Sequence, residues 1–91
     1  MPLLQAETSA VPVLTEVLAS RDAEARLLAA EDLEKVGEGA RPAVPALLWA
    51  LDDEDETVRE QVGQALFRID RQAAERAGLE RTIRGLMRRC P

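Results

Sequence analysis

The sequence predicts an all-α fold built from a repeated pair of helices, and three observations lead to this expectation. Residues 10–26 (AVPVLTEVLASRDAEAR) recur 33 residues later as residues 43–59 (AVPALLWALDDEDETVR). Within each copy, apolar residues return at intervals of three and four, the spacing of one face of an α-helix. Aromatic residues are only 2% of a chain that is 46% apolar, and a core of Leu and Ala favours close-packed helices over strands.

The two copies align without a gap over residues 10–36 and 43–69. Chance agreement in a chain rich in Leu and Ala explains some of the apolar matches, but it does not readily supply a matched proline, aspartate and arginine as well. We therefore interpret the two segments as a true structural repeat. The identical positions are Ala10/Ala43, Val11/Val44, Pro12/Pro45, Leu14/Leu47, Leu18/Leu51, Asp22/Asp55, Arg26/Arg59 and Leu33/Leu66.

The first half of each copy predicts a short amphipathic helix. In the second copy this helix has an apolar stripe at positions i, i+3, i+4 and i+7. Pro45 is compatible with the helix because it lies in the first turn, where a missing N–H costs no intrahelical hydrogen bond. The acidic residues 52–54 then interrupt the pattern and predict a turn. The residues of the stripe are Val44, Leu47, Leu48 and Leu51.

The second half of each copy predicts a longer helix that begins after an aspartate. Asp55 is a good N-cap because its carboxylate accepts hydrogen bonds from free backbone N–H groups of the first turn. Asp22 has the same place in the first copy, where Gly37 is the expected C-terminal stop. The predicted buried faces are Ala25, Ala29, Leu33 and Val36 in the first copy, and Val58, Val62, Ala65, Leu66 and Ile69 in the second.

The segment after Ile69 follows the repeat only loosely. Residues 70–77 are either a continuation of the preceding helix or a short new helix that is capped by Asp70 and ended by Gly78. Residues 79–89 predict a last amphipathic helix. The chain is thus expected to be one domain over residues 1–91, with an N-terminal cap segment at 1–9, repeats at 10–37 and 43–69, and a partial repeat or cap helix at 70–91.

Composition and charge limit the possible environments and partners. Ninety-one residues suffice for one small domain, and the single cysteine excludes an internal disulfide. No basic leader and no apolar run of about 18 residues is present, so we expect a cytoplasmic protein with no membrane contact. Residues 1–60 carry a net charge of −9 and residues 61–91 one of +4. This acidic body argues against nucleic acid as a partner, because phosphates would be repelled.

The residue types offer no catalytic, cofactor or metal site. The chain has no histidine, which removes the commonest general base and a common metal ligand. The acidic run 52–56 lacks the alternating ligands, the glycine and the closing glutamate of a calcium loop. We interpret it as a solvated turn with a helix cap, and we expect no enzyme activity.

The order A-V-P-A-L-L-x-A-L-x-D-x-D-x-x-V-R, followed by A-L-x-x-I, resembles HEAT-like repeats of the bacterial phycobilisome-lyase type. The resemblance implies a short right-handed α-solenoid of antiparallel helix pairs, with four to five main helices and the second helices along one concave face. It also implies that Asp53, in the turn, and Arg59, after Val58, help tie neighbouring turns together. Ser20 stands where the second copy has Asp53, which predicts that this tie is missing in the first copy.

Two aromatic residues, Trp49 and Phe67, stand where the first copy has Glu16 and Glu34. Aromatic side chains are enriched at the centres of protein interfaces, so one interpretation makes both residues anchors for a partner. The other interpretation is that the C-terminal segment covers them. Both remain open from the sequence, with coverage the more expected for Phe67.

Charged residues supply the remaining candidates for a binding surface. The arginines of the last predicted helix are expected on one face. They either bind RNA, a phosphate group or an acidic protein, or form a solvated face or pair with the acidic body, which is the more expected interpretation. The second helices of the two copies offer a polar surface for another protein. The candidates are Arg81, Arg84 and Arg88 in the last helix, and Glu31, Glu34, Glu60, Gln64 and Arg68 in the second helices.

We therefore expect a non-catalytic protein-interaction or scaffold module that binds another protein by shape and charge. Two and a half repeats leave apolar ends, and solenoids usually need three units or polar caps. The alternative is thus a structural piece that forms a homodimer through an exposed end or belongs to a longer array. A weaker alternative, an accessory role in chromophore attachment, follows only from the resemblance.

Overall fold

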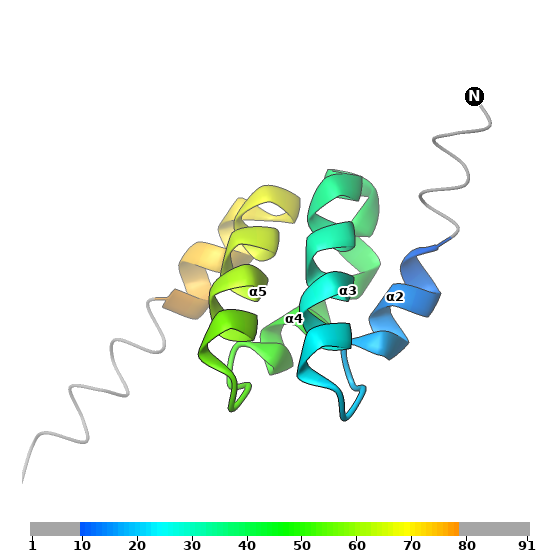
Figure 1. Ribbon diagram of the computed structural model, residues 1–91. Helices are drawn as coiled ribbons and strands as arrows, with labels where there is room; N and C mark the ends of the chain where they lie inside the picture. The colour runs from blue at the N-terminus through cyan, green and yellow to red at the C-terminus, as the bar shows by residue number, and fades with distance from the viewer. Residues whose placement is uncertain (1–9, 79–91) are drawn as a thin grey trace, which may run out of the picture.

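The computed structural model describes residues 10–78, and within this range it contains helices and no strand (Figure 1). The predicted helix over residues 79–89 and the N-terminal cap segment lie outside the described residues. In chain order the elements are α2 (Val11–Val17), α3 (Ala23–Val36), the 3₁₀-helix η1 (Gly37–Ala43), α4 (Val44–Ala50) and α5 (Glu56–Ile69). A further helix covers residues 71–78.

The helices form two successive pairs, α2 with α3 and α4 with α5. In each pair the first helix has seven residues and the second has fourteen. The two long helices α3 and α5 pack side by side, and each short helix lies against the long helix of its own pair (Figure 1). The all-α fold of stacked helix pairs predicted from the sequence is confirmed, and the handedness of a longer superhelix stays a prediction.

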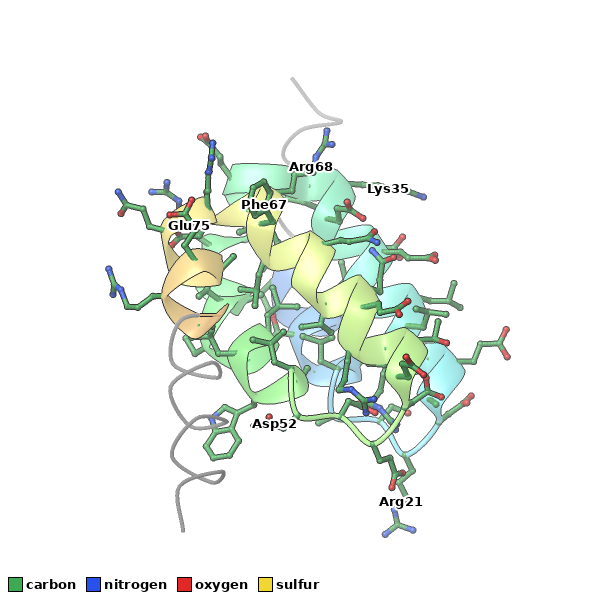
Figure 2. The ribbon with its side chains drawn as sticks, turned by 90° about the vertical axis from the view of Figure 1, so that its left-hand side faces the viewer. Arg21, Lys35, Asp52, Phe67, Arg68 and Glu75 are labelled. Carbon is green, nitrogen blue, oxygen red and sulfur yellow. The ribbon has the colours of Figure 1, made fainter. Side chains whose placement is uncertain are left out.

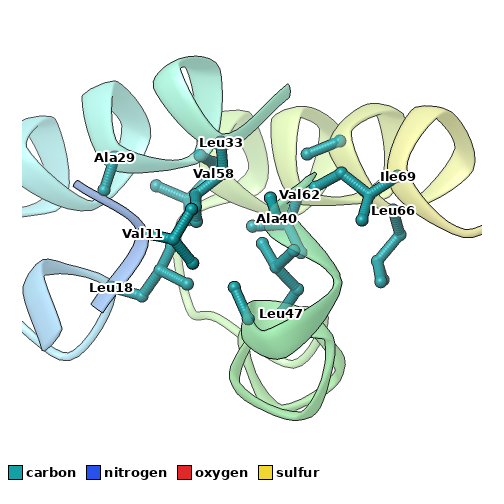
Figure 3. Close-up of a cluster of buried hydrophobic side chains, with 13 residues drawn as sticks. Val11, Leu18, Ala29, Leu33, Ala40, Leu47, Val58, Val62, Leu66 and Ile69 are labelled. Carbon is teal, nitrogen blue, oxygen red and sulfur yellow. The ribbon is translucent and has the colours of Figure 1, made fainter. Parts of the chain in front are cut away.

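The core is a single cluster made almost entirely of aliphatic side chains and alanines (Figure 3). Small alanines are fully buried where helices approach closely, and branched side chains fill the space between the two pairs. Burial of this kind is worth about 25 cal/mol per Å² of apolar surface removed from water. The cluster contains Val11, Leu18, Ala29, Ala30, Leu33, Ala40, Ala43, Leu47, Val58, Val62, Ala65, Leu66 and Ile69.

The caps predicted from the sequence are present in both long helices. The Asp22 carboxylate accepts a hydrogen bond from the backbone N–H of Glu24 at 3.0 Å. The Asp55 carboxylate accepts two, from the backbone N–H groups of Thr57 at 2.8 Å and of Val58 at 3.1 Å. Gly37 ends α3 with φ at +72°, a backbone conformation that costs little only for glycine.

The connection between the two pairs is a 3₁₀-helix, which the sequence analysis did not predict. Glycine and proline in residues 37–43 are typical of a loop. In the structure Ala40 and Ala43 of this segment are fully buried, and η1 contacts all four α-helices α2–α5. The segment is therefore part of the core rather than a surface loop.

The start of the last described helix decides between the two alternatives for residues 70–77. Asp70 adopts an extended backbone with φ at −150°, which ends α5. Its side chain then accepts a hydrogen bond from the backbone N–H of Ala73 at 3.2 Å. A new helix capped by Asp70 is therefore correct, and Gly78, its expected end, is the last residue described.

Candidate protein-binding surface

The two repeats are joined by an ion pair between Arg26 on α3 and Asp53 in the turn before α5. Nε of Arg26 donates to one carboxylate oxygen at 2.6 Å, and Nη2 donates to the other at 3.0 Å. Only 10% of the arginine side chain and 8% of the aspartate side chain are exposed. This two-point geometry is the strongest form of an arginine–carboxylate contact. The hydrogen bonds from Arg26 hold the pKa of Asp53 below its usual value, and Asp53 in turn raises the pKa of Arg26.

The ion pair corrects the expectation that the tie is missing in the first repeat. The arginine of one repeat binds the aspartate of the following repeat, so Ser20 does not take part in the tie between these two units. Ser20 does keep another role of Asp53. Its hydroxyl accepts from the backbone N–H of Asp22 at 3.2 Å, as the Asp53 carboxylate accepts from that of Asp55 at 2.9 Å.

A second polar contact crosses the same junction. Nε2 of Gln61 on α5 donates to a carboxylate oxygen of Glu34 on α3 at 2.7 Å. Glu34 was a candidate for binding a partner, and the structure instead places its side chain at the contact between the repeats. Leu28 on α3 has the repeat position of Gln61, and Phe67 on α5 has that of Glu34. Both of these apolar side chains are exposed.

The other candidates on the second helices lie on the outer surface. Glu60, Gln64 and Arg68 on α5 are exposed, and Glu31 on α3 is half-buried. Figure 2, which looks at the α5 end of the molecule, labels Arg68 beside Phe67. The arginines at positions 81, 84 and 88 lie outside the described residues.

Trp49 is the most exposed large apolar side chain of the described residues, with 82% of its surface accessible. Residues 79–91, which belong to the segment expected to cover it, lie outside the described residues, so both interpretations of Trp49 stay predictions. Trp49 borders a groove of about 350 Å³ between α2 and α4. The groove is lined by Thr15, Leu18, Ala19, Ala46, Trp49, Ala50, Asp52 and Asp53.

Phe67 is half exposed, at 53%. The guanidinium of Arg71 lies 5.3 Å from the centre of its ring, within the range of a cation–π contact. Arg71 also donates to the Glu75 carboxylate at 2.9 Å. Figure 2 shows Phe67 at the opposite end of the molecule from Asp52, which borders the groove. The two aromatic residues therefore belong to separate surfaces.

Among residues 10–78 no group of three or more His, Cys, Asp or Glu side chains is arranged to hold a metal ion. In the same range, every helix is too short or too polar to cross a membrane. The buried polar side chains described all have a hydrogen-bond partner. What the described residues offer is a rigid helical surface with two exposed aromatic side chains.

Stacked helix pairs joined through their second helices define the class of short α-solenoids. Comparison with known families then matches residues 6–89 of the chain to HEAT repeats. The chain belongs to the HEAT-repeat family. The narrower phycobilisome-lyase type is not part of this match and stays a prediction. No curated protein and no solved structure gives a significant match.

The sequence analysis named Asp53 as a residue that ties turns together, but it missed Arg26, the residue that binds it. Arg26 and Asp53 are 27 positions apart, so neither helical periodicity nor capping rules connect them. One signal was present, because the arginine is identical in both copies while the turn residue changes from Ser20 to Asp53. In the described pair of repeats the link runs forward, from the arginine of the first repeat to the aspartate in the turn of the second.

Proposed function

We propose that this protein is a non-catalytic protein-interaction module in the cytoplasm, with Trp49 as the anchor of its binding surface. HEAT repeats generally mediate protein–protein interaction or scaffolding. The two repeats supply a rigid frame, since their contact combines a packed aliphatic core with the Arg26–Asp53 pair. A frame of this kind presents side chains without a large loss of conformational entropy on binding.

The single observation that carries the proposal is the exposure of Trp49 beside a groove. Tryptophan has a large apolar surface, and leaving it in water forfeits burial free energy. Tryptophan is also among the residues that contribute most to binding at protein interfaces. The groove between α2 and α4 gives a partner a concave surface next to this side chain.

The charge around the groove favours a particular chemistry in the partner. Five acidic residues follow one another at positions 52–56, just after the C-cap of α4, and of these Asp53 is already paired with Arg26. A partner segment with an apolar side chain for the groove and basic residues beside it would match this surface. The outer residues of the second helices, Glu31, Glu60, Gln64 and Arg68, are proposed as a secondary, polar part of the contact surface.

Affinity capture with three forms of the chain tests the proposal. We expect Trp49→Ala to lose proteins that both the wild-type chain and Val13→Ala retain. Val13 is the matched control because it is an exposed apolar residue on α2, outside the residues that line the groove. Equal retention by all three forms would contradict the role of Trp49.

Intrinsic fluorescence gives a direct second reading, because Trp49 is the single tryptophan of the chain. A retained protein, once purified, should shift the emission of Trp49 to shorter wavelength as the indole leaves water. An emission spectrum that does not change at saturating partner would exclude the groove as the contact site.

A further inference from the structure

The contact between the two repeats is a template for how this protein receives a neighbouring helix pair. Three residues of α3, at spacings of four, carry the contact. Arg26 binds Asp53, Ala30 is fully buried, and Glu34 accepts a hydrogen bond from Gln61. The template therefore consists of an arginine for a carboxylate in the turn, a small residue for close approach, and a side chain that meets the next long helix.

The same three positions recur on the outer face of α5 as Arg59, Gly63 and Phe67. Arg59 is already held in the pose of Arg26. Its Nη1 donates to the backbone carbonyl of Asp53 at 2.6 Å, as Nη1 of Arg26 donates to that of Ser20 at 2.8 Å. Nε and Nη2 of Arg59 have no acceptor among residues 10–78.

In the part of the chain that the structure describes, the middle of this face is open at Gly63, and at its upper end the Arg71 guanidinium lies over the ring of Phe67. Gly63 is half-buried whereas its counterpart Ala30 is fully buried, and a Cβ atom on Gly63 would meet no other atom within 4 Å. Phe67 is 53% exposed. An apolar ring stands where the inner contact has a carboxylate, so a partner should offer an apolar side chain at this position.

The opposite end of the stack does not match this face. Ser20 has no carboxylate for an arginine, and Asp32 stands where the second repeat has Ala65, which is fully buried. Asp32 is exposed in the structure. A second copy stacked head to tail would place Arg59 against Ser20 and bury the carboxylate of Asp32 without a partner, which is strongly unfavourable. The occupant of the α5 face is therefore not another copy in this arrangement.

We propose that the α5 face made by Arg59, Gly63 and Phe67 is a docking surface for an antiparallel helix pair of a different protein. The turn of that helix pair carries an aspartate or glutamate that binds Nε and Nη2 of Arg59. Its long helix approaches at Gly63 and places an apolar side chain against Phe67. This surface is separate from the Trp49 groove, so the inference does not depend on the proposed function.

The chain itself supplies a probe with the required chemistry. The variant Ser20→Asp/Asp32→Ala/Arg59→Ala has a carboxylate in its first turn and a small apolar residue in place of Asp32. Its Leu28, which is 51% exposed, would meet Phe67. The third change removes the arginine of the probe, so that the probe does not associate with itself.

Sedimentation velocity of the wild-type chain with this probe tests the proposal. We expect one-to-one complexes, while the wild-type chain alone and the probe alone sediment as monomers. Arg59→Ala in the wild-type chain should weaken the complex at least about tenfold, since it removes two charge-assisted hydrogen bonds. Phe67→Glu should weaken it as well. Arg41→Ala, which removes an exposed arginine on η1, is the control and should leave the complex unchanged.

Three results would overturn the inference. One is the absence of any complex between the wild-type chain and the probe. Another is a complex that Arg59→Ala and Arg41→Ala weaken to the same degree. The third is self-association of the wild-type chain that Arg59→Ala abolishes, because the occupant of the face would then be a second copy.

Discussion

Replacing either of two glycines of this protein with alanine should change its stability, in one case upward and in the other downward. Gly63 lies inside α5, and a Cβ atom there would contact nothing within 4 Å. Gly37 ends α3 with φ at +72° and ψ at −137°. Alanine at position 63 should gain the difference in helix propensity, about 0.8–1.0 kcal/mol. Alanine at position 37 would be forced into a region that is nearly restricted to glycine, at a cost of about 1–3 kcal/mol.

These magnitudes are large for a chain of this length. A domain of this size has a total unfolding free energy of roughly 5–14 kcal/mol, at about 0.05–0.15 kcal/mol per residue. A change of 1 kcal/mol corresponds to a shift in Tm of about 4–8 °C. Gly63→Ala should therefore raise Tm by roughly 4–8 °C, and Gly37→Ala should lower it by at least as much.

Urea denaturation followed by circular dichroism at 222 nm measures both variants against the wild-type chain. Unchanged slopes with opposite shifts in midpoint are the expected result. If Gly63→Ala lowered the midpoint, a neighbouring side chain would have to occupy the space beside Gly63. If Gly37→Ala were neutral, the end of α3 would not need the positive φ of Gly37, and the role of Gly37 as the stop of α3 would be refuted.

Three further predictions concern the core, the junction and a cap. Leu47→Ala should lower the unfolding free energy by about 2–5 kcal/mol because Leu47 is fully buried. Leu48 on the same helix is 37% exposed, so Leu48→Ala should lower the unfolding free energy by clearly less. Equal losses in urea titrations would contradict the described core. Asp53→Asn should destabilise the chain at neutral pH, and its difference in unfolding free energy from the wild-type chain should shrink on acidification. The reason is that the folded-state pKa of Asp53 is depressed, so its contribution to stability is complete above the unfolded pKa of about 3.9 and is lost as the pH falls through the folded value. A difference that is constant from pH 7 to about pH 2 would argue against the ion pair with Arg26. Asp55→Ala should cost about 1 kcal/mol through the lost N-cap, and full retention of the wild-type Tm would show that the two hydrogen bonds to the start of α5 add nothing.

The helices and their ends could be predicted from the sequence because local interactions determine them. The N-caps at Asp22 and Asp55 act on backbone groups two or three residues away. The stop at Gly37 depends on one backbone angle. Each of these features depends on fewer than five consecutive residues, so a local sequence pattern suffices to predict it.

The features that were missed depend on tertiary packing. The 3₁₀ conformation of η1 is stabilised by the burial of Ala40 and Ala43 against other helices, which no local pattern records. The Arg26–Asp53 pair joins residues of different repeats. The 82% exposure of Trp49 among the described residues follows from the packing of α4 against its neighbours, and sequence periodicity alone left two interpretations open.

The sequence identified candidate binding residues by their type, but it did not give their arrangement in space. Trp49 stood out because its counterpart, Glu16, is charged, yet the groove beside it needs α2 and α4 to be placed against each other. Glu34 was chosen as a surface residue of the second helix, and its hydrogen bond to Gln61 became visible only once the repeats were stacked.

The burial of η1 determines where this chain tolerates engineering. A connector between structural units is normally the place where extra residues can be inserted. Here such an insertion would pull Ala40 and Ala43 out of the interior, so a tag, a cleavage site or a permuted terminus is better tolerated at Arg21, an exposed residue at the tip of the first turn.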